Sequence, residues 1–216
     1  MSNGEHFFDF AAEVGLTKHL GGQAATDELV ALCHVGSSSY VLDVGCGAGA
    51  TACYLADRYG CRVMGVDISD MMVARSWERA ERDKVAHMTE FQVADAQDLP
   101  FDDGLFDAVL TESVTAFPED KKLAVQEYAR VTRAGGYVGL NESTWRKVPP
   151  PPEIVAWAGQ DLGASVQPLT AEEWVNLLEG AGLTDIVSRP SAVDTRAEAR
   201  GVVKRYGWGG MARIFA

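Results

Sequence analysis

A glycine-rich segment, YVLDVGCGAGAT (residues 40–51), constrains the fold more than any other part of this sequence. Gly45, Gly47 and Gly49 directly follow an apolar run that predicts a buried strand, and ATACYLADRY after them predicts a helix. Glycines at such a turn let the backbone approach a ligand closely, and the following helix offers unpaired N–H groups to an anion. The segment therefore predicts a ligand-binding strand, loop and helix, with a tight turn that binds nothing as the alternative.

Strand-like and helix-like segments alternate from about residue 23, which is the pattern of βαβ units on a parallel sheet. Expected strands cover residues 40–45, 61–67, 88–95, 106–113, 137–144 and 183–190, and expected helices cover residues 26–35, 50–60, 69–83, 120–133 and 170–182. Ser69 and Thr170 are expected to cap helices, and glycines at 60, 135–136 and 182 to end them. The predicted fold is α/β and Rossmann-like, with a doubly wound, mostly parallel sheet of six to seven strands and helices on both faces.

Composition narrows the class of ligand. The formal net charge of −12 argues against a surface that follows nucleic-acid phosphates, so a small molecule is the expected partner. No apolar stretch reaches the roughly 20 residues of a membrane-spanning helix, and no secretory segment or CxxC pair is present, which favours the cytoplasm. Residues 1–22 are expected to form a cap or lid, 23–190 the core domain, and 191–216 a helical extension that either ends in a short strand or continues beyond Ala216.

The glycine segment by itself fits more than one cofactor. Gly45, Gly47 and Ala50 match the dinucleotide pattern G-x-G-x-x-A, and Asp67 lies where a carboxylate binds ribose hydroxyls. An NAD-dependent oxidoreductase is therefore one reading. Asp43 argues against it, because a nicotinamide-binding fold usually places an apolar side chain at this position of the first strand.

Further motifs follow in order along the chain. Asp95 ends the third expected strand in VADAQDLPF, where its carboxylate is placed to accept a hydrogen bond from an adenine amino group. Together with VLDVGCGAGA, VMGVDIS, FDAVLTES and ARVTRAGG, this motif gives five matches in order. Over roughly residues 20–190 the sequence resembles the class I S-adenosylmethionine-dependent methyltransferases, particularly the small-molecule branch that includes the ubiquinone and menaquinone C-methyltransferases.

The resemblance implies a seven-stranded sheet, S-adenosyl-L-methionine as the methyl donor and S-adenosyl-L-homocysteine as its product. The glycines would lie beside the methionine portion, with Asp43 supporting the loop and the ammonium, while Asp67 would bind the ribose hydroxyls. Ile68 and Met72 would pack on adenine, and Asp95 with the next backbone N–H would read its edge. The full set expected to contact the cofactor is His19, Asp43, Gly45, Cys46, Gly47, Gly49, Asp67, Ile68, Met72, Asp95, Ala96 and Glu112.

The charges are consistent with this cofactor independently of the resemblance. S-adenosylmethionine carries a sulfonium, an ammonium and a carboxylate, and three aspartates with one helix N-terminus complement these charges without an arginine. A pyrophosphate would gain nothing from Asp43. The alternative for each aspartate is a cap or a solvated loop residue.

The methyl acceptor is expected beyond the fourth and fifth strands, because ligands of open α/β sheets bind at the carboxyl ends of the strands. In-line transfer from a sulfonium depends mainly on positioning and desolvation. Glu112 and Glu142 are the candidate catalytic carboxylates if the acceptor must lose a proton, and Ser113, Asn141 and Trp145 are candidate substrate contacts. Two carboxylates beside an indole favour a neutral or cationic acceptor. The alternative for each of these side chains is that it is a polar residue at the rim of the site or in a loop and has no role in the reaction.

Other residues carry weaker predictions. His19 is either part of a lid over the cofactor or a surface histidine, and no histidine or cysteine spacing predicts a metal site. The four cysteines are most simply explained as small buried residues. A cofactor-binding protein that regulates a partner without catalysing a reaction stays an alternative function, and the sequence does not determine the oligomeric state.

Overall fold

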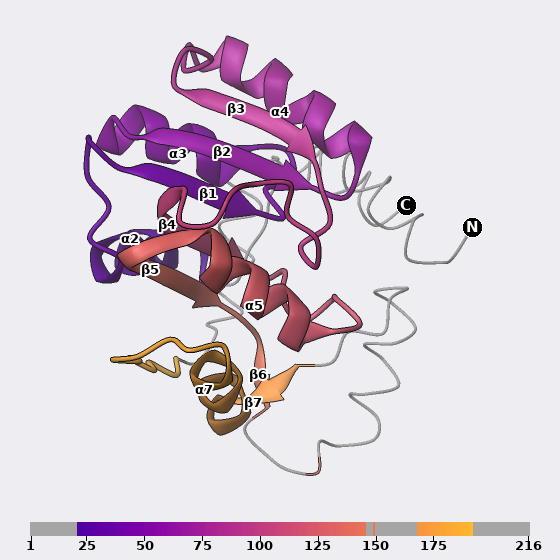
Figure 1. The fold of residues 1–216 in the computed structure, drawn as a ribbon. Helices are drawn as coiled ribbons and strands as arrows, with labels where there is room; N and C mark the ends of the chain where they lie inside the picture. The colour runs from indigo at the N-terminus through magenta and orange to yellow at the C-terminus, as the bar shows by residue number, and fades with distance from the viewer. Residues whose placement is uncertain (1–20, 146–148, 150–167, 192–216) are drawn as a thin grey trace, which may run out of the picture.

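The structure, a computed structural model, describes residues 21–145, 149 and 168–191 of the 216-residue chain. Its centre is a five-stranded parallel sheet of order β3-β2-β1-β4-β5 (Figure 1). The strands are β1 (Tyr40–Val44), β2 (Arg62–Asp67), β3 (Thr89–Val93), β4 (Phe106–Glu112) and β5 (Thr132–Asn141). The described helices are α2 (Gly22–Leu32), α3 (Ala50–Tyr59), α4 (Asp70–Arg82), α5 (Lys121–Val131) and α7 (Ala171–Gly180).

Helices cover both faces of the sheet. Successive strand residues point to opposite sides, so neighbouring residues of one strand pack against different helices. Val41 packs in a core cluster with residues of α2, α3 and α4, whereas its neighbour Leu42 packs in a second cluster with α5, against which Leu177 and Leu178 of α7 also pack. Both strand residues are fully buried. Burial on both faces explains why the strands read as continuous apolar runs, and it confirms the doubly wound α/β architecture.

The chain order places a reversal at the centre of the sheet. From β1 the chain passes through α3 to β2 and through α4 to β3, and it then returns to the other side of β1 to form β4. The carboxyl ends of β1 and β4 therefore lead to connections on opposite sides. This is the switch point at which open α/β sheets bind their ligands.

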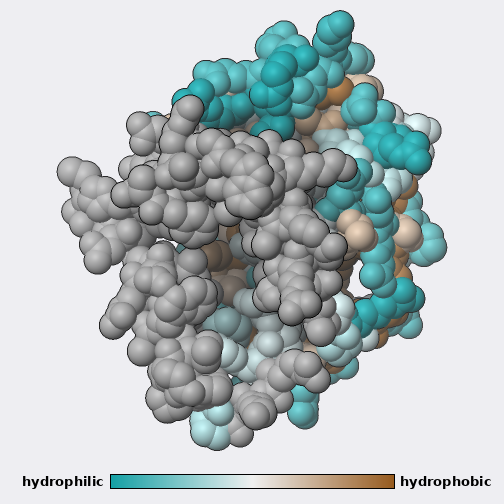
Figure 2. Space-filling model, turned by 180° about the vertical axis from the view of Figure 1, so that it is seen from behind, coloured by the Kyte–Doolittle hydropathy of each residue, from teal (hydrophilic) through white to brown (hydrophobic). Residues whose placement is uncertain are grey.

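Helix caps agree with the sequence where local chemistry determines them. The Ser69 hydroxyl accepts from the Met72 N–H at 3.3 Å, and Thr170 forms a complete capping box with Glu173. Gly60 ends α3 in the left-handed conformation. The outward side of α4 is charged, and Figure 2 shows hydrophilic surface gathered at the top of the molecule, over α4 and β3.

The predicted end of the helix over residues 120–133 is wrong. α5 ends at Val131 and β5 begins at Thr132, so Gly135 and Gly136 lie within a strand instead of closing the helix. A Cβ at Gly136 would lie 2.7 Å from the backbone oxygen of Asp107. The glycine therefore permits close approach of β5 to β4, at a shift in the strand register.

The predicted strand over residues 183–190 is also wrong. This segment is irregular, Val187 is 62% exposed, and Arg189 forms an ion pair with Glu28 of α2 at 2.8 Å. Among the described residues, no strand pairs with this segment. In the described residues the sheet therefore has five strands and not six or seven, and β6 (Thr144–Trp145) and β7 (Leu169–Thr170) form a separate parallel pair.

Most of the predicted lid (1–22) and nearly all of the predicted C-terminal extension (191–216) lie outside the described residues, as does His19. The proposed division of the chain into these segments and a core of residues 23–190 stays a prediction.

Candidate active site

The three glycines of the loop between β1 and α3 have different surroundings. A Cβ built on Gly45 would lie 2.4 Å from Val114 Cγ2, and one on Gly49 would lie 2.9 Å from the Cβ of Ser76. A Cβ on Gly47 would meet no atom of the described residues within 4 Å. The outer glycines therefore let the loop pack against neighbouring segments, whereas Gly47 alone faces open space that a ligand can use.

Side chains of β2 and α4 form hydrogen bonds with the backbone of the glycine loop between β1 and α3. Asp67 Oδ2 accepts from the Gly47 N–H at 2.9 Å, and the Ser76 hydroxyl donates to the Gly47 carbonyl at 2.8 Å. Arg79 Nε donates to the neighbouring Ala48 carbonyl at 2.6 Å. Both polar groups of Gly47 are therefore fixed, which holds this glycine in its left-handed conformation with φ of 52°.

Asp43 lies at the carboxyl end of β1 and is buried, with 2% of its surface exposed. Its Oδ2 atom is buried and finds no hydrogen-bond partner among the described residues. Burial raises the pKa of Asp43 well above its ordinary value, and the charges of Glu112 and Asp67 raise it further. Because a buried negative charge is costly, a ligand cation would stabilise three carboxyl groups that lie at one edge of the sheet.

β2 ends at Asp67, the residue that is predicted to bind the ribose hydroxyls. Asp67 accepts from the Ser69 N–H at 3.0 Å as well as from Gly47, and burial raises the pKa of its carboxyl group. Each carboxylate oxygen has two lone pairs, so these bonds leave capacity for ribose hydroxyls. Ile68 is 69% exposed and offers an apolar surface for adenine, whereas Met72 is 5% exposed and offers little.

The predicted adenine-reading segment follows β3. Asp95 accepts from the N–H of Gln97 at 2.9 Å, and its own carbonyl accepts from the Asp98 N–H at 3.0 Å, which closes a tight turn. Ala96 is half-buried and packs against the second core cluster. The turn therefore presents Asp95 at the same sheet edge as Asp67 and Asp43, since all three follow or end neighbouring parallel strands.

Glu112 ends β4 and accepts hydrogen bonds from three elements. The hydroxyls of Thr26 in α2 and Thr51 in α3 each donate to it at 3.0 Å, and the Asn141 side chain of β5 donates at 3.4 Å. Ser113, which follows it, has a positive φ of 62° and donates its N–H to the Asn141 carbonyl at 2.8 Å. The structure thus brings together three of the residues predicted on the acceptor side.

Glu142 lies just beyond β5 and binds the turn after β4. Its Oε1 accepts from the N–H groups of Val114 at 3.0 Å and Thr115 at 2.7 Å, while its buried Oε2 has no partner among the described residues. Burial raises the pKa of this carboxyl group. Glu142 therefore fixes the segment that packs against Gly45. Trp145 lies in the separate β6 strand.

Sequence reasoning missed Ser76 and Arg79 as loop-holding residues. Ser76 is fully buried, and a hydroxyl at helical spacing from the apolar Met72 and Val73 is a signal in the sequence that it needs a polar partner. Cys46 contributes its backbone to the loop, but its thiol is buried near Ser76 at 3.8 Å, and burial raises its pKa.

Two further properties bear on the class of site. Across residues 21–145 and 168–191, histidine, cysteine, aspartate and glutamate side chains form no group of three that could hold a metal ion. Within the same parts of the chain, every helix is too short or too polar to span a bilayer.

Comparison with known proteins agrees with this geometry. A family described as "Methyltransferase domain" matches residues 42–140. An uncharacterized protein of Haemophilus influenzae is 31% identical over 86% of this chain and 75% of its own length. Tocopherol O-methyltransferase of Arabidopsis thaliana is 31% identical over 68% of this chain, which spans only 44% of that protein.

Solved structures share the fold. Phosphoethanolamine N-methyltransferase 2 of Haemonchus contortus, crystallised with S-adenosyl-L-methionine, matches with a TM-score of 0.77 and 21% identity, over 90% of this chain and 45% of that protein. The glycine loop, the carboxylates that follow successive strands and these relatives lead to one assignment. The chain belongs to the class I S-adenosylmethionine-dependent methyltransferases, in their small-molecule branch.

Proposed function

We propose that this protein binds S-adenosyl-L-methionine at the carboxyl edge of β1, β2 and β3 and transfers its methyl group to a small molecule. The observation that carries the proposal is the buried Asp43 Oδ2, which has no hydrogen-bond partner in the described part of the chain and is flanked by the charges of Asp67 and Glu112. Asp43 lies on the strand that leads into the Gly47 loop. A ligand with an ammonium and a sulfonium would satisfy this carboxylate. NAD carries a pyrophosphate, which the same three carboxylates would repel.

The donor supplies an activated methyl carbon, and the chain supplies orientation. Asp67 and the residues of the Gly47 loop would hold the ribose and methionine portions, and the exposed Ile68 side chain would cover adenine. Because the donor is already oriented when it is bound, less translational and rotational entropy is lost in reaching the transition state of an in-line displacement. No proton needs to move unless the acceptor is protonated at the reacting atom.

We place the acceptor beside the ends of β4 and β5, where Glu112, Ser113 and Asn141 come together. The carboxylates favour a neutral or cationic acceptor over a carboxylate. Of the proteins named above, one is an O-methyltransferase and one an N-methyltransferase. The proposal includes oxygen, nitrogen and carbon acceptors. The cytoplasm is the proposed location.

The cofactor assignment is tested by thermal shift with S-adenosylhomocysteine, NAD and NADP side by side. We expect only S-adenosylhomocysteine to raise the melting temperature, and Asp67→Ala to remove most of this rise, because charge-assisted bonds to ribose and the Gly47 N–H are both lost. Asp57→Ala, an exposed aspartate on α3, is the matched control and should keep the full rise. An undiminished rise in the Asp67 variant would remove the ribose assignment.

The acceptor side is tested by kinetics with a labelled methyl donor and a metabolite library. Glu112→Gln and Glu142→Gln should each lower turnover of the true acceptor much more than they weaken S-adenosylhomocysteine binding. Glutamine keeps one oxygen as an acceptor, and at position 112 the neighbouring threonine hydroxyls can accept from its amide, so the fold should persist. Normal turnover in both variants would make these side chains structural.

A regulatory protein that binds the cofactor without turnover is the second candidate. One observation favours it: the Glu112 and Glu142 carboxylates already accept bonds from Thr26, Thr51 and the turn after β4. Cofactor binding with no methylation of any compound in the library would support this candidate over the enzyme.

A further inference from the structure

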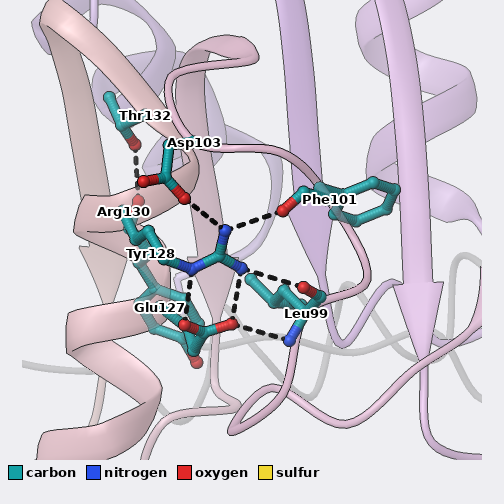
Figure 3. A network of polar contacts seen from close by, with 7 residues as sticks. All are labelled: Leu99, Phe101, Asp103, Glu127, Tyr128, Arg130 and Thr132. Atoms are coloured by element: carbon teal, nitrogen blue, oxygen red, sulfur yellow. Dashed lines mark hydrogen bonds and ion pairs between the residues drawn. The ribbon is translucent and has the colours of Figure 1, made fainter.

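The segment between β3 and β4 is fixed to α5 by one guanidinium group (Figure 3). Arg130 Nε and Nη2 donate to the two oxygens of Glu127 at 2.7 and 2.8 Å. The same guanidinium donates to the carbonyls of Leu99 at 2.9 Å and Phe101 at 2.7 Å, and to Asp103 at 2.8 Å. It thus holds three positions of the segment, and its planar fork allows this with a single side chain.

Glu127 completes the attachment from the helix side. Its Oε2 also accepts from the Leu99 N–H at 2.8 Å, and the hydrogen bonds from Arg130 lower its pKa, so this carboxylate stays charged at neutral pH. Leu99 is 3% exposed and packs in the second core cluster. The end of the turn that begins at Asp95 is therefore both buried and hydrogen-bonded.

Gln97 holds the beginning of the same turn. Its side-chain amide donates to Asp95 Oδ1 at 3.2 Å and to Oδ2 at 3.3 Å, in addition to the bond from its backbone N–H. Its Oε1 accepts from the N–H of Asp120, the N-cap of α5, at 3.0 Å. One side chain therefore connects the Asp95 carboxylate to the helix that carries Arg130.

We propose that Gln97 and Arg130 are positioning residues that make this protein selective for a 6-aminopurine, because they fix the Asp95 carboxylate where the amino group of adenine must donate. The inference rests on the proposed function and extends it from cofactor binding to discrimination between purine bases. A fixed carboxylate accepts a hydrogen bond from the amino group but repels the carbonyl oxygen that replaces it in hypoxanthine. A mobile carboxylate can turn away from that oxygen, so selectivity needs the residues that hold it.

The test compares binding of S-adenosylhomocysteine with that of S-inosylhomocysteine, in which a carbonyl replaces the 6-amino group and the adjacent N1 carries a hydrogen. We expect the unaltered protein to prefer the adenine compound at least tenfold. Asp95→Asn should bring this preference close to unity or reverse it, because the amide can donate to the hypoxanthine oxygen.

Two variants address the positioning residues directly. Gln97→Met keeps the length of the side chain but removes its polar atoms, and Arg130→Lys keeps the charge but loses the fork. Each should reduce the preference at least threefold, mainly by improving relative binding of the inosine compound. Gln126→Met, on the exposed side of α5, and Arg133→Lys, whose guanidinium pairs with Asp107, are matched controls that should leave the preference unchanged.

The outcomes distinguish failure of the proposed function from failure of the positioning role of Gln97 and Arg130. If S-adenosylhomocysteine does not bind the unaltered protein, the proposed function fails and this inference with it. If it binds and Asp95→Asn loses the preference while Gln97→Met and Arg130→Lys keep it, only the positioning role is overturned. Variants that weaken both compounds by the same factor also overturn it, since a purely structural role affects both ligands equally.

Discussion

Gly47→Val should abolish binding of S-adenosylhomocysteine, with an affinity at least a hundredfold lower, in a protein that still folds. The first atom of the new side chain would meet no atom within 4 Å in the part of the chain that the structure describes, so it would not disturb the core. It would instead occupy the space that the proposed ligand needs. The same change at Gly45 would not be informative, because its side chain would collide with Val114 2.4 Å away.

Valine at this position also carries a backbone cost, since Gly47 has φ of 52° and the left-handed region costs a side chain about 1–2 kcal/mol. Gly135→Val is therefore the matched control: φ is 74° there, and a Cβ again meets nothing within 4 Å. Both variants should lose similar stability in thermal unfolding, but only Gly47→Val should lose binding in calorimetry. Retained affinity with a native circular dichroism spectrum would show that Gly47 does not face the ligand.

The sequence predicted those parts of the fold that depend on neighbouring residues. Ser69 and Thr170 cap helices because their hydroxyls reach N–H groups three residues later, and a pattern of four residues contains this information. The end of α5 was predicted wrongly because Gly136 responds to a contact with Asp107, 29 residues earlier in the chain. A glycine that ends a helix and a glycine that admits a neighbouring strand look alike in sequence.

In the site, too, features that depend on local sequence could be predicted, whereas contacts between distant residues could not. Asp43, Asp67 and Asp95 could be placed at one edge because parallel strands end on the same side. The bonds from Ser76 and Arg79 to the glycine loop, and from Arg130 to Leu99, join residues about 30 positions apart and appear in no local motif. The sequence therefore indicated which strand ends carry carboxylates, but not which distant side chains hold the neighbouring loops in place.

Asp43→Asn should have two effects of opposite sign, a more stable free protein and weaker binding of S-adenosylhomocysteine. Burial raises the pKa of Asp43 well above 3.8, so the folded protein retains a proton that the unfolded chain releases as the pH rises above this value. The free energy of unfolding consequently falls as the pH rises toward the folded pKa. Asparagine cannot ionise and avoids this loss, and we expect the melting temperature of the free protein at pH 7 to rise by about 2–6 °C.

Binding should weaken at least tenfold, because the neutral amide no longer attracts the ammonium of the ligand. A ligand control isolates this contact: 5′-methylthioadenosine lacks the amino-acid portion, so its affinity should be nearly equal for the two proteins. The pH dependence gives a second readout. As the pH rises above the ordinary range of a carboxyl group, the affinity of the unaltered protein for S-adenosylhomocysteine should rise as Asp43 ionises, because burial raises the pKa of this group. This rise should be smaller in the variant, which has no carboxyl group at this position.

A variant that is stabilised but binds S-adenosylhomocysteine as tightly as the unaltered protein would show that Asp43 supports only the loop. Loss of both ligands together would show that the asparagine has displaced the loop as a whole. Only a selective loss of the compound with the ammonium, in a protein that melts at a higher temperature, matches a buried carboxyl group that is kept for its ligand. Such a group destabilises the free fold as it ionises and attracts the cation in its ionised form, which is the trade-off expected of a binding site.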